Sequence, residues 1–148
     1  MDFVIKKFEK TYYEEVFGMM KTFYNSPAVF TNGSDEIFQA DLNASLDENC
    51  VFIECYVFLS EEKILGYSMI SKSFSTEFGK QCIWLEDLYL KPEFRGHGII
   101  PKFISFIENL YKNSILRLEV EDENAHAVHV YEKSGFSRLP YVEMKKEI

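Results

Sequence analysis

Residues 84–101 read WLEDLYLKPEFRGHGIIP, and the organisation of the whole chain follows from this segment. It starts as an apolar run typical of a buried strand and reaches a turn at Pro92. Gly96 and Gly98 follow, and the apolar residues after them recur at helical spacing. A strand that leads through a glycine-containing loop into a helix is suited to bind phosphate, because the first N–H groups of a helix have no partner within it.

Two motifs can be compared with those of known proteins. Residues 95–100 read RGHGII, and residues 124–136 read NAHAVHVYEKSGF. The first resembles the Arg/Gln-x-x-Gly-x-Gly/Ala loop with which the GNAT family of N-acetyltransferases holds the pyrophosphate of acetyl-CoA. The second meets every named position of that family's Asn-x-x-Ala-x-x-x-Tyr-x-Lys/Arg-x-Gly-Phe signature. Since both motifs occur in the family's order, the sequence is identified as similar to this family.

The order of the predicted elements agrees with the family's α/β plan, β-α-α-β-β-β-α-β-α-β, a twisted mixed sheet with helices on both sides. Strands are expected at residues 2–8, 50–59, 63–74, 81–90, 115–120 and 136–145. Helices are expected from an N-cap at Thr11 to about Asn25, and at residues 35–46, 99–113 and 124–134, with a turn at 31–35. Gly135 is expected to end the last helix in a left-handed conformation.

Length and charge limit the classes of function. A chain of 148 residues with 47% apolar residues is expected to form a single domain over residues 1–148. A net charge of −8 argues against nucleic acid or an anionic membrane as a partner. Acidity suits a cationic amine, but it also serves simply to keep a protein soluble.

The cysteines and histidines do not predict a metal site. Cys50, Cys55 and Cys82 lack paired ligand spacing and are interpreted as reduced residues of the core. His126 and His129 lie three apart on one predicted helix without a third ligand nearby. The sequence begins with no signal-peptide pattern and has no long apolar span, so a cytoplasmic protein is expected.

The resemblance implies acetyl-CoA as a co-substrate and assigns residues to its binding. The resemblance implies that the backbone of Leu88, Tyr89 and Leu90 pairs with the pantetheine, and that Asn124 binds the pantetheine or caps its helix. The loop residues implied to bind the diphosphate are Arg95, Gly96, His97, Gly98, Ile99 and Ile100. Ile100 departs from the family's Gly or Ala, and Pro101 removes an amide although it fits a first helical turn. This departure bears on how tightly the diphosphate is held.

Two residues are candidates for proton transfer. Leu85-Glu86-Asp87 matches the Leu-Glu-Asp run of polyamine and related small-amine acetyltransferases, which implies Glu86 as the base, directly or through a water. Strand alternation predicts that Glu86 and Asp87 point to opposite faces. Tyr131 is implied as the acid that protonates the leaving thiolate. The structural alternatives are that Glu86 pairs with a basic residue or binds a neighbouring loop, and that Tyr131 only packs its ring against the pantetheine arm or the core.

The acceptor site is expected between the first two helices and the strand that carries Glu86. Tyr24 and Phe30 are candidate lining residues, and the aromatic residues near Phe74 and Phe78 are further candidates. The expected activity is acetyl transfer to a primary amine of a small molecule, by direct attack in a ternary complex. Acetylation of a protein or peptide amine, and an acyl-CoA-binding module with little turnover, are the alternatives. The resemblance also implies a homodimer.

Overall fold

The computed structural model describes residues 1–31 and 33–148. In these residues five strands form one sheet in the order β1-β2-β3-β4-β5, in which β4 and β5 are parallel and the other neighbours are antiparallel. The strands are β1 (Val4–Lys7), β2 (Ile53–Ser60), β3 (Lys63–Ser75), β4 (Lys80–Leu90) and β5 (Ile115–Leu118). This arrangement confirms the predicted mixed sheet.

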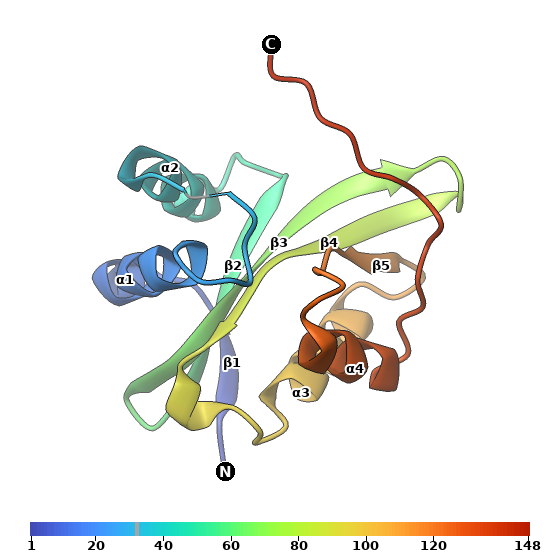
Figure 1. Ribbon diagram of the computed structural model, residues 1–148. Helices are drawn as coiled ribbons and strands as arrows, with labels where there is room; N and C mark the ends of the chain where they lie inside the picture. Colours follow the sequence, from blue (N-terminus) through green and yellow to red (C-terminus); the bar gives the residue numbers. More distant parts are fainter. Residues whose placement is uncertain (32) are drawn as a thin grey trace.

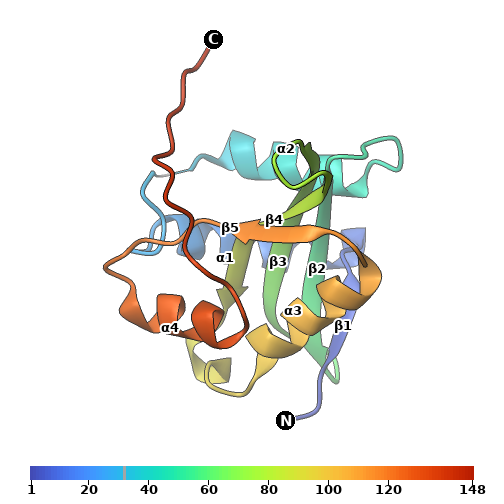
Figure 2. The same cartoon turned by 90° about the vertical axis from the view of Figure 1, so that its right-hand side faces the viewer.

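Within the described part of the chain, four α-helices cover the two faces of the sheet. They are α1 (Tyr13–Tyr24), α2 (Asp35–Leu46), α3 (Ile99–Leu110) and α4 (Ala125–Lys133). Helices α1 and α2 lie on one face, and α3 and α4 lie on the other (Figures 1 and 2). The predicted bounds of α2 agree with the structure at both ends. Ser34 caps the N-terminal end, where its side chain accepts a hydrogen bond from the Ile37 N–H at 3.3 Å.

Alternating side chains of β2 to β4 divide the core into two clusters. The cluster under α1 and α2 includes Met20, Leu42 and Tyr67, and the cluster under α3 includes Phe103 and Ile104. These residues are at most 2% exposed. Because successive residues of a strand point to opposite faces, one continuous strand such as β3 contributes to both clusters.

Several predicted boundaries are corrected by the structure. Thr11 is no N-cap, since a 3₁₀ turn (Lys10–Tyr12) precedes α1 and no side chain caps that helix. Helix α3 ends at Leu110 instead of Asn113, whose positive φ of 64° lies outside a helix. β2 begins only at Ile53, after two exposed apolar residues. The predicted turn at 31–35 includes Asn32, which lies outside the described residues.

The predicted strand at 136–145 is not formed. From Phe136 to Ile148 the chain runs without helix or strand and ends away from the body of the protein (Figure 1). Pro140 has no N–H to donate to a ladder, and Val142 and Met144 are 88% and 93% exposed. Without a neighbouring strand or an apolar face against these side chains, the alternating pattern alone does not produce a strand. In the described residues, no helix is long and apolar enough to cross a membrane.

Candidate active site

A β-bulge interrupts β4 at Glu86. Met69 of β3 pairs with Asp87, whereas the next residue of β3, Ile70, pairs with Leu85. Glu86 is therefore the extra residue that two opposed strands leave unpaired at a bulge. Such a residue bends its strand and changes where the neighbouring side chains point.

The bulge brings Glu86 and Asp87 to the same face of the sheet. Asp87 accepts a hydrogen bond from Tyr24 of α1, so it faces the α1–α2 layer. Glu86 Oε1 accepts a hydrogen bond of 2.7 Å from Ser71 Oγ, and Ser71 shares that face with Met69 because the two are alternate residues of β3. The prediction that the two carboxylates point to opposite faces is thus wrong, because strict alternation fails at a bulge.

Asp87 lies at the centre of a buried hydrogen-bond network. Its carboxylate is 3% exposed and accepts from Tyr24 Oη at 2.7 Å and from Tyr67 Oη at 2.8 Å. Its backbone carbonyl accepts from Ser68 Oγ at 2.7 Å. Burial raises the pKa of Asp87, and the two phenol donors oppose part of that rise. The network connects the end of α1 to the bulge.

A third carboxylate faces the bulge from α2. Burial raises the pKa of Asp41 to about 6, and the charges of Asp87 and Glu86 add to the effect. None of these three groups has a lysine or arginine within ion-pair distance in residues 1–31 and 33–148. The space between the bulge and α2 is therefore strongly electronegative.

β4 leaves one backbone edge open beyond the bulge. The parallel ladder with β5 runs from Cys82–Ile115 to Leu85–Leu118, whereas β4 continues to Leu90. Over Glu86–Leu90 the strand is thus paired only with β3 within the described chain. Gly66 of β3 permits this close pairing, since a Cβ there would lie 2.2 Å from the Tyr89 carbonyl oxygen. Leu88, Tyr89 and Leu90, the predicted pantetheine-binding residues, all belong to this half-open stretch.

The glycine loop leads directly from that edge into α3. Gly96 and Gly98 have φ of 80° and 76°, a region that favours glycine, and Gly98 is the N-cap of α3. Arg95 Nε donates to the Leu90 carbonyl at 3.0 Å, and its guanidinium lies 5.9 Å from the Tyr89 ring centre. His97 is exposed. The free N–H groups of the first turn point out of the helix end.

The departure at Ile100 and Pro101 is accommodated by the fold. Ile99 is 1% exposed, and Ile100 packs against the α3 cluster, so neither side chain fills the loop. Pro101 occupies the first turn of α3, where an N–H would have no partner in the helix. The loop therefore keeps the backbone shape that the two glycines create.

The second motif forms α4 with a defined start and end. Asn124 Oδ1 accepts from the Ala127 N–H at 3.3 Å as an N-cap. At the other end the Gly135 N–H donates to Glu132, and the Phe136 N–H donates to the Tyr131 carbonyl, both at 3.0 Å, with Gly135 at φ 100°. This is a Schellman motif, and the predicted C-cap is confirmed.

Tyr131 is held by that motif. Its ring meets the Phe136 ring edge-on with 5.9 Å between centres, which is the apolar contact that accompanies such a helix end. Burial raises the pKa of Tyr131 to about 12. In the described residues no protein group hydrogen-bonds its hydroxyl. Tyr131 therefore stays protonated through the neutral range and has a proton to donate.

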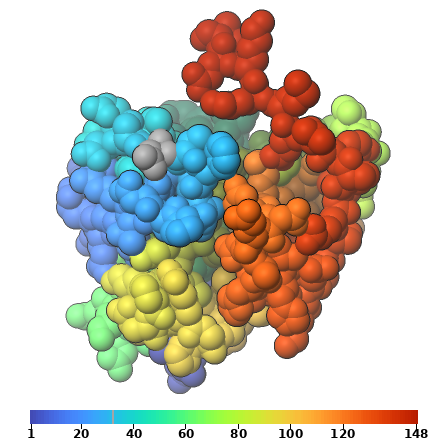
Figure 3. Space-filling view, in the orientation of Figure 1, coloured from blue at the N-terminus to red at the C-terminus, as the bar shows by residue number. Residues whose placement is uncertain are grey.

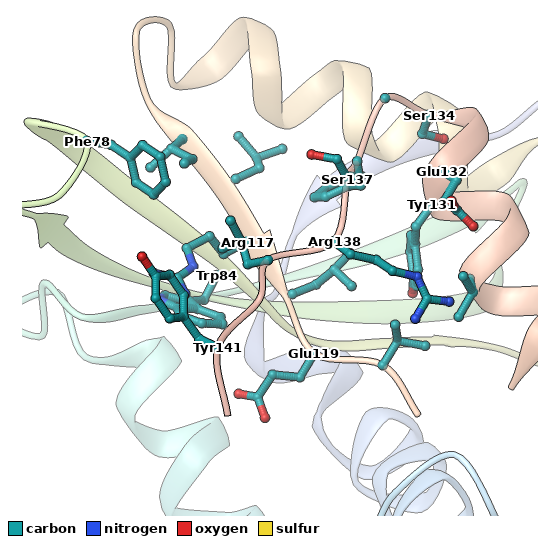
Figure 4. A pocket seen from close by; sticks show the side chains of 18 of the residues that line it. Phe78, Trp84, Arg117, Glu119, Tyr131, Glu132, Ser134, Ser137, Arg138 and Tyr141 are labelled. Atoms are coloured by element: carbon teal, nitrogen blue, oxygen red, sulfur yellow. The ribbon is translucent and has the colours of Figure 1, made fainter. Parts of the chain in front are cut away.

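A cavity of about 950 Å³ adjoins Tyr131 along the outer side of β5 (Figure 4). Its lining combines residues of β5, α4 and the C-terminal segment with Trp84 of β4 and with Glu119, which follows β5. The glycine loop does not line this cavity. Burial and a hydrogen bond with Glu143 raise the pKa of Glu119 to about 7, with the hydrogen bond as the larger cause.

The other predicted lining residues are less closely gathered. Tyr24 belongs to the Asp87 network, but Phe30 is 91% exposed and Phe74 is 68% exposed. Phe78 lines the cavity beside β5. The described part of the chain contains no cluster of three potential metal ligands, and its three cysteines are free.

Sequence reasoning missed Asp41, Tyr67 and the role of Asp87. Asp87 was visible in the Leu-Glu-Asp run, but its partners lie 63 and 20 residues away in the chain. Asp41 stands on the inner side of a predicted helix that otherwise presents Phe38 and Leu42 to the core. A charged residue on an apolar helix face was the available signal for Asp41.

Comparisons with known proteins find relatives of this chain among the acetyltransferases. The thialysine N-epsilon-acetyltransferase of Bos taurus is 39% identical over 83 residues, and that of Sus scrofa is 37% identical over the same length. These stretches cover 54% of the chain and 48% of each relative, so the chain spans about half the length of the curated relatives it matches.

Solved structures share the fold over nearly the full chain. A possible acetyltransferase from Clostridium difficile 630 has a TM-score of 0.82 at 19% identity, covering 99% of this chain and 97% of its own. The aminoglycoside N-acetyltransferase AAC(6')-Iy in complex with CoA has a TM-score of 0.78 at 17% identity, covering 99% and 95%. The model of the Acetyltransferase (GNAT) family matches residues 13–136. The chain belongs to the acetyltransferase (GNAT) family.

Proposed function

We propose that residues 1–148 act as one acetyl-CoA-dependent N-acetyltransferase whose acceptor is a small, cationic primary amine. The observation that carries the proposal is the continuous segment of the bulge, the half-open edge Glu86–Leu90 and the glycine loop. Its two ends offer a carboxylate and a set of free N–H groups. The name of the thialysine-acetylating relatives supports an amine acceptor, as does the uncompensated negative charge near the bulge.

Acetyl-CoA, when bound, supplies the thioester carbon that the amine attacks. The residues fit such a group: backbone N–H groups of the loop and Arg95 suit the diphosphate, and the open edge of β4 suits the pantetheine amides. Ile100 is packed on the core and does not obstruct the loop. Asn124 Oδ1 is used as a cap, which leaves its amide group free for a pantetheine oxygen.

In the proposed reaction the amine nitrogen forms a bond to the acetyl carbon and the C–S bond breaks. Glu86 takes one proton from the ammonium group, directly or through a water, which frees the nitrogen lone pair for the attack. Tyr131 gives its proton to the thiolate, and the second proton that the nitrogen loses on becoming an amide restores the Tyr131 phenol. An N–H of the β4 edge polarises the thioester carbonyl. Asp41 and Asp87 attract the cationic acceptor, and Tyr24 contributes to its site.

The central experiment measures release of CoA thiol from acetyl-CoA with a panel of amines: thialysine, lysine, a diamine, a polyamine, an aminoglycoside and a peptide with a free N-terminus. We expect turnover with one of the small cationic amines, and initial-rate lines that intersect as a ternary complex requires. Turnover with the peptide alone would establish the protein-acetylating alternative. Thermal stabilisation by acetyl-CoA without turnover of any amine would support the alternative that the chain is an acyl-CoA-binding module.

Two substitutions test the proton transfers. Glu86→Gln and Tyr131→Phe should each lower kcat by about 10²–10⁴-fold, with little change in thermal stabilisation by acetyl-CoA. Glu14→Gln on the exposed side of α1 and Tyr12→Phe in the turn before it are matched controls that should retain full activity. Equal activity of Glu86→Gln and the wild type would exclude Glu86 as the base.

We also propose a cytoplasmic location. It is supported by three free cysteines, of which Cys55 and Cys82 are buried, a state that a reducing compartment preserves. Fractionation of cells that produce the full-length protein would test this location.

A further inference from the structure

Ser71 of β3 holds the carboxylate of Glu86. Its hydroxyl donates to Glu86 Oε1 at 2.7 Å, although Ser71 itself lies opposite Trp84 in the β3–β4 ladder. The contact is therefore diagonal, and it reaches the residue that the bulge leaves unpaired. In residues 1–31 and 33–148 this hydroxyl is the only group that hydrogen-bonds or ion-pairs with the Glu86 carboxylate.

The groups that face Glu86 from the helical layer are acids. They are Tyr24 of α1, Asp41 of α2 and the adjacent Asp87. Burial raises the pKa of each of the three, and the negative charge of Glu86 adds to each rise. The helices therefore offer the Glu86 carboxylate no positive charge, and the two nearby carboxyl groups favour its protonated form.

Glu119 is a further acidic neighbour, on the side of β5. The parallel ladder ends at the pair Leu85–Leu118, so Glu86 and Glu119 are the next residues of the two strands. A hydrogen bond with Glu143 and burial raise the pKa of Glu119, and the charge of Glu86 adds to the rise. Figure 3 shows α1 and α2 (blue and cyan) on one side of this face and the chain from β5 to α4 (orange) on the other. Acidic groups thus surround Glu86 from both sides.

A neutral donor suits this position better than a cation would. A hydrogen bond to the ionised carboxylate opposes the protonation that the acidic neighbours favour. A lysine or arginine would stabilise the same charge, but it would also repel a cationic acceptor and occupy the base. The Ser71 hydroxyl adds no charge and binds one of the two carboxylate oxygens. Because Glu86 is exposed, the hydroxyl also restricts a side chain that otherwise has several rotamers.

We propose that Ser71 is a positioning residue for the base. It fixes Glu86 through Oε1, leaves Oε2 for the proton of the acceptor ammonium, and keeps the carboxylate ionised without a positive charge beside a cationic substrate. Ser71 keeps its own proton throughout, since the transferred proton goes from the ammonium nitrogen to Glu86. This inference rests on the proposed function, which assigns Glu86 as the base. A reacting group displaced by about 1 Å costs roughly 10²-fold in rate, which sets the scale of the expected effect.

Steady-state kinetics with the amine that the wild type acetylates fastest test the positioning. Ser71→Ala should lower kcat by about 10–100-fold with an unchanged KM for acetyl-CoA. The acidic limb of its kcat–pH profile should move to higher pH, because the ionised base has lost its donor. Ser71→Thr keeps a hydroxyl and should restore both values. Ser73→Ala, on the same face of β3, is the matched control and should equal the wild type.

The kinetic results have two outcomes that would overturn the proposal. One is a lower kcat of Ser71→Ala with an unmoved acidic limb, which a merely structural loss would give. The other is a threonine variant as slow as the alanine variant. The need for a neutral donor is tested by Ser71→Lys, which should raise the KM for the amine by about tenfold or more and leave stabilisation by acetyl-CoA intact. An unchanged KM for the amine would contradict that need.

A titration without substrates distinguishes the contact of Ser71 from the proposed activity. The carboxyl carbon of Glu86 can be followed by NMR in protein that contains isotope-labelled glutamate, and the Glu86→Gln variant assigns its signal. The titration should be centred at a higher pH in Ser71→Ala than in the wild type. Equal titrations would overturn the proposal for Ser71 even in an active enzyme. A shifted titration without turnover of any amine would support the contact and overturn the proposed function alone.

Discussion

The two halves of β4 belong to one strand but differ in their pairing partners. From Cys82 to Leu85 the strand is paired with β3 on one side and β5 on the other. From Glu86 to Leu90 it is paired with β3 alone, after a bulge of one residue. The first half holds the sheet together, whereas the second half presents unpaired backbone groups and two carboxylates. One extra residue and one short neighbour thus convert a core strand into a candidate binding strand.

The buried carboxylate should be the most sensitive point of the second half. Asp87→Ala removes the acceptor of two phenol hydroxyls, and each buried donor left unsatisfied costs about 1–3 kcal/mol. We expect the free energy of unfolding in urea to fall by about 2–6 kcal/mol for the pair. Asp87→Asn retains an acceptor and serves as the matched control with a smaller loss. If the free energy of unfolding falls by less than it does for a surface substitution, the network does not stabilise the second half of β4.

The tight pairing of β3 with the second half should tolerate no added methyl group. Gly66→Ala places a Cβ against the Tyr89 carbonyl, and overpacking of this kind costs about 1–3 kcal/mol. Gly18→Ala is the control, because its Cβ meets nothing within 4 Å in α1. That change should stabilise the protein by roughly 0.5–1 kcal/mol in thermal unfolding. Equal effects of the two substitutions would contradict the close approach.

A substitution that affects the first half of β4 should lower stability only slightly and should leave catalysis unchanged. Arg117→Gln removes a cation from the face of Trp84, which is worth about 0.5–1 kcal/mol at a partly exposed site. We expect a small fall in the melting temperature and unchanged kcat with acetyl-CoA and amine. A large loss of activity would show that the two halves of β4 are not separate in function.

Asp41 of α2, which faces the bulge, should make the stability of the protein depend on pH. Its pKa of about 6 in the folded protein lies above the ordinary value of 3.8, so the folded state binds the proton more tightly. Stability from this group is therefore full below about pH 4, falls as pH rises to about 6 and is constant above. Asp41→Asn should remove this slope in unfolding curves measured from pH 4 to 8. If the slope persists, another group causes it.

The local features of the site were predictable from sequence, whereas its long-range contacts were not. Gly96, Gly98 and Gly135 adopt the positive φ values that their motifs require, because those conformations depend on neighbouring residues only. The bulge at Glu86 depends on the register with β3, which sequence alternation does not encode. Asp41 and Tyr24 meet the bulge only because α1 and α2 pack on that face. The missing C-terminal strand likewise depends on a neighbour rather than on its own residues.

The bulge and the glycine loop belong to one unbroken stretch of backbone, and the Arg95–Leu90 hydrogen bond fixes the corner between them. The straight part from Glu86 to Leu90 is about 13 Å long. Under the proposed activity, the length of this stretch sets the distance between the site that binds a diphosphate and the site where an acyl group reacts. Donors whose arm is shorter or longer than pantetheine would then be rejected by length alone, before their acyl group is tested.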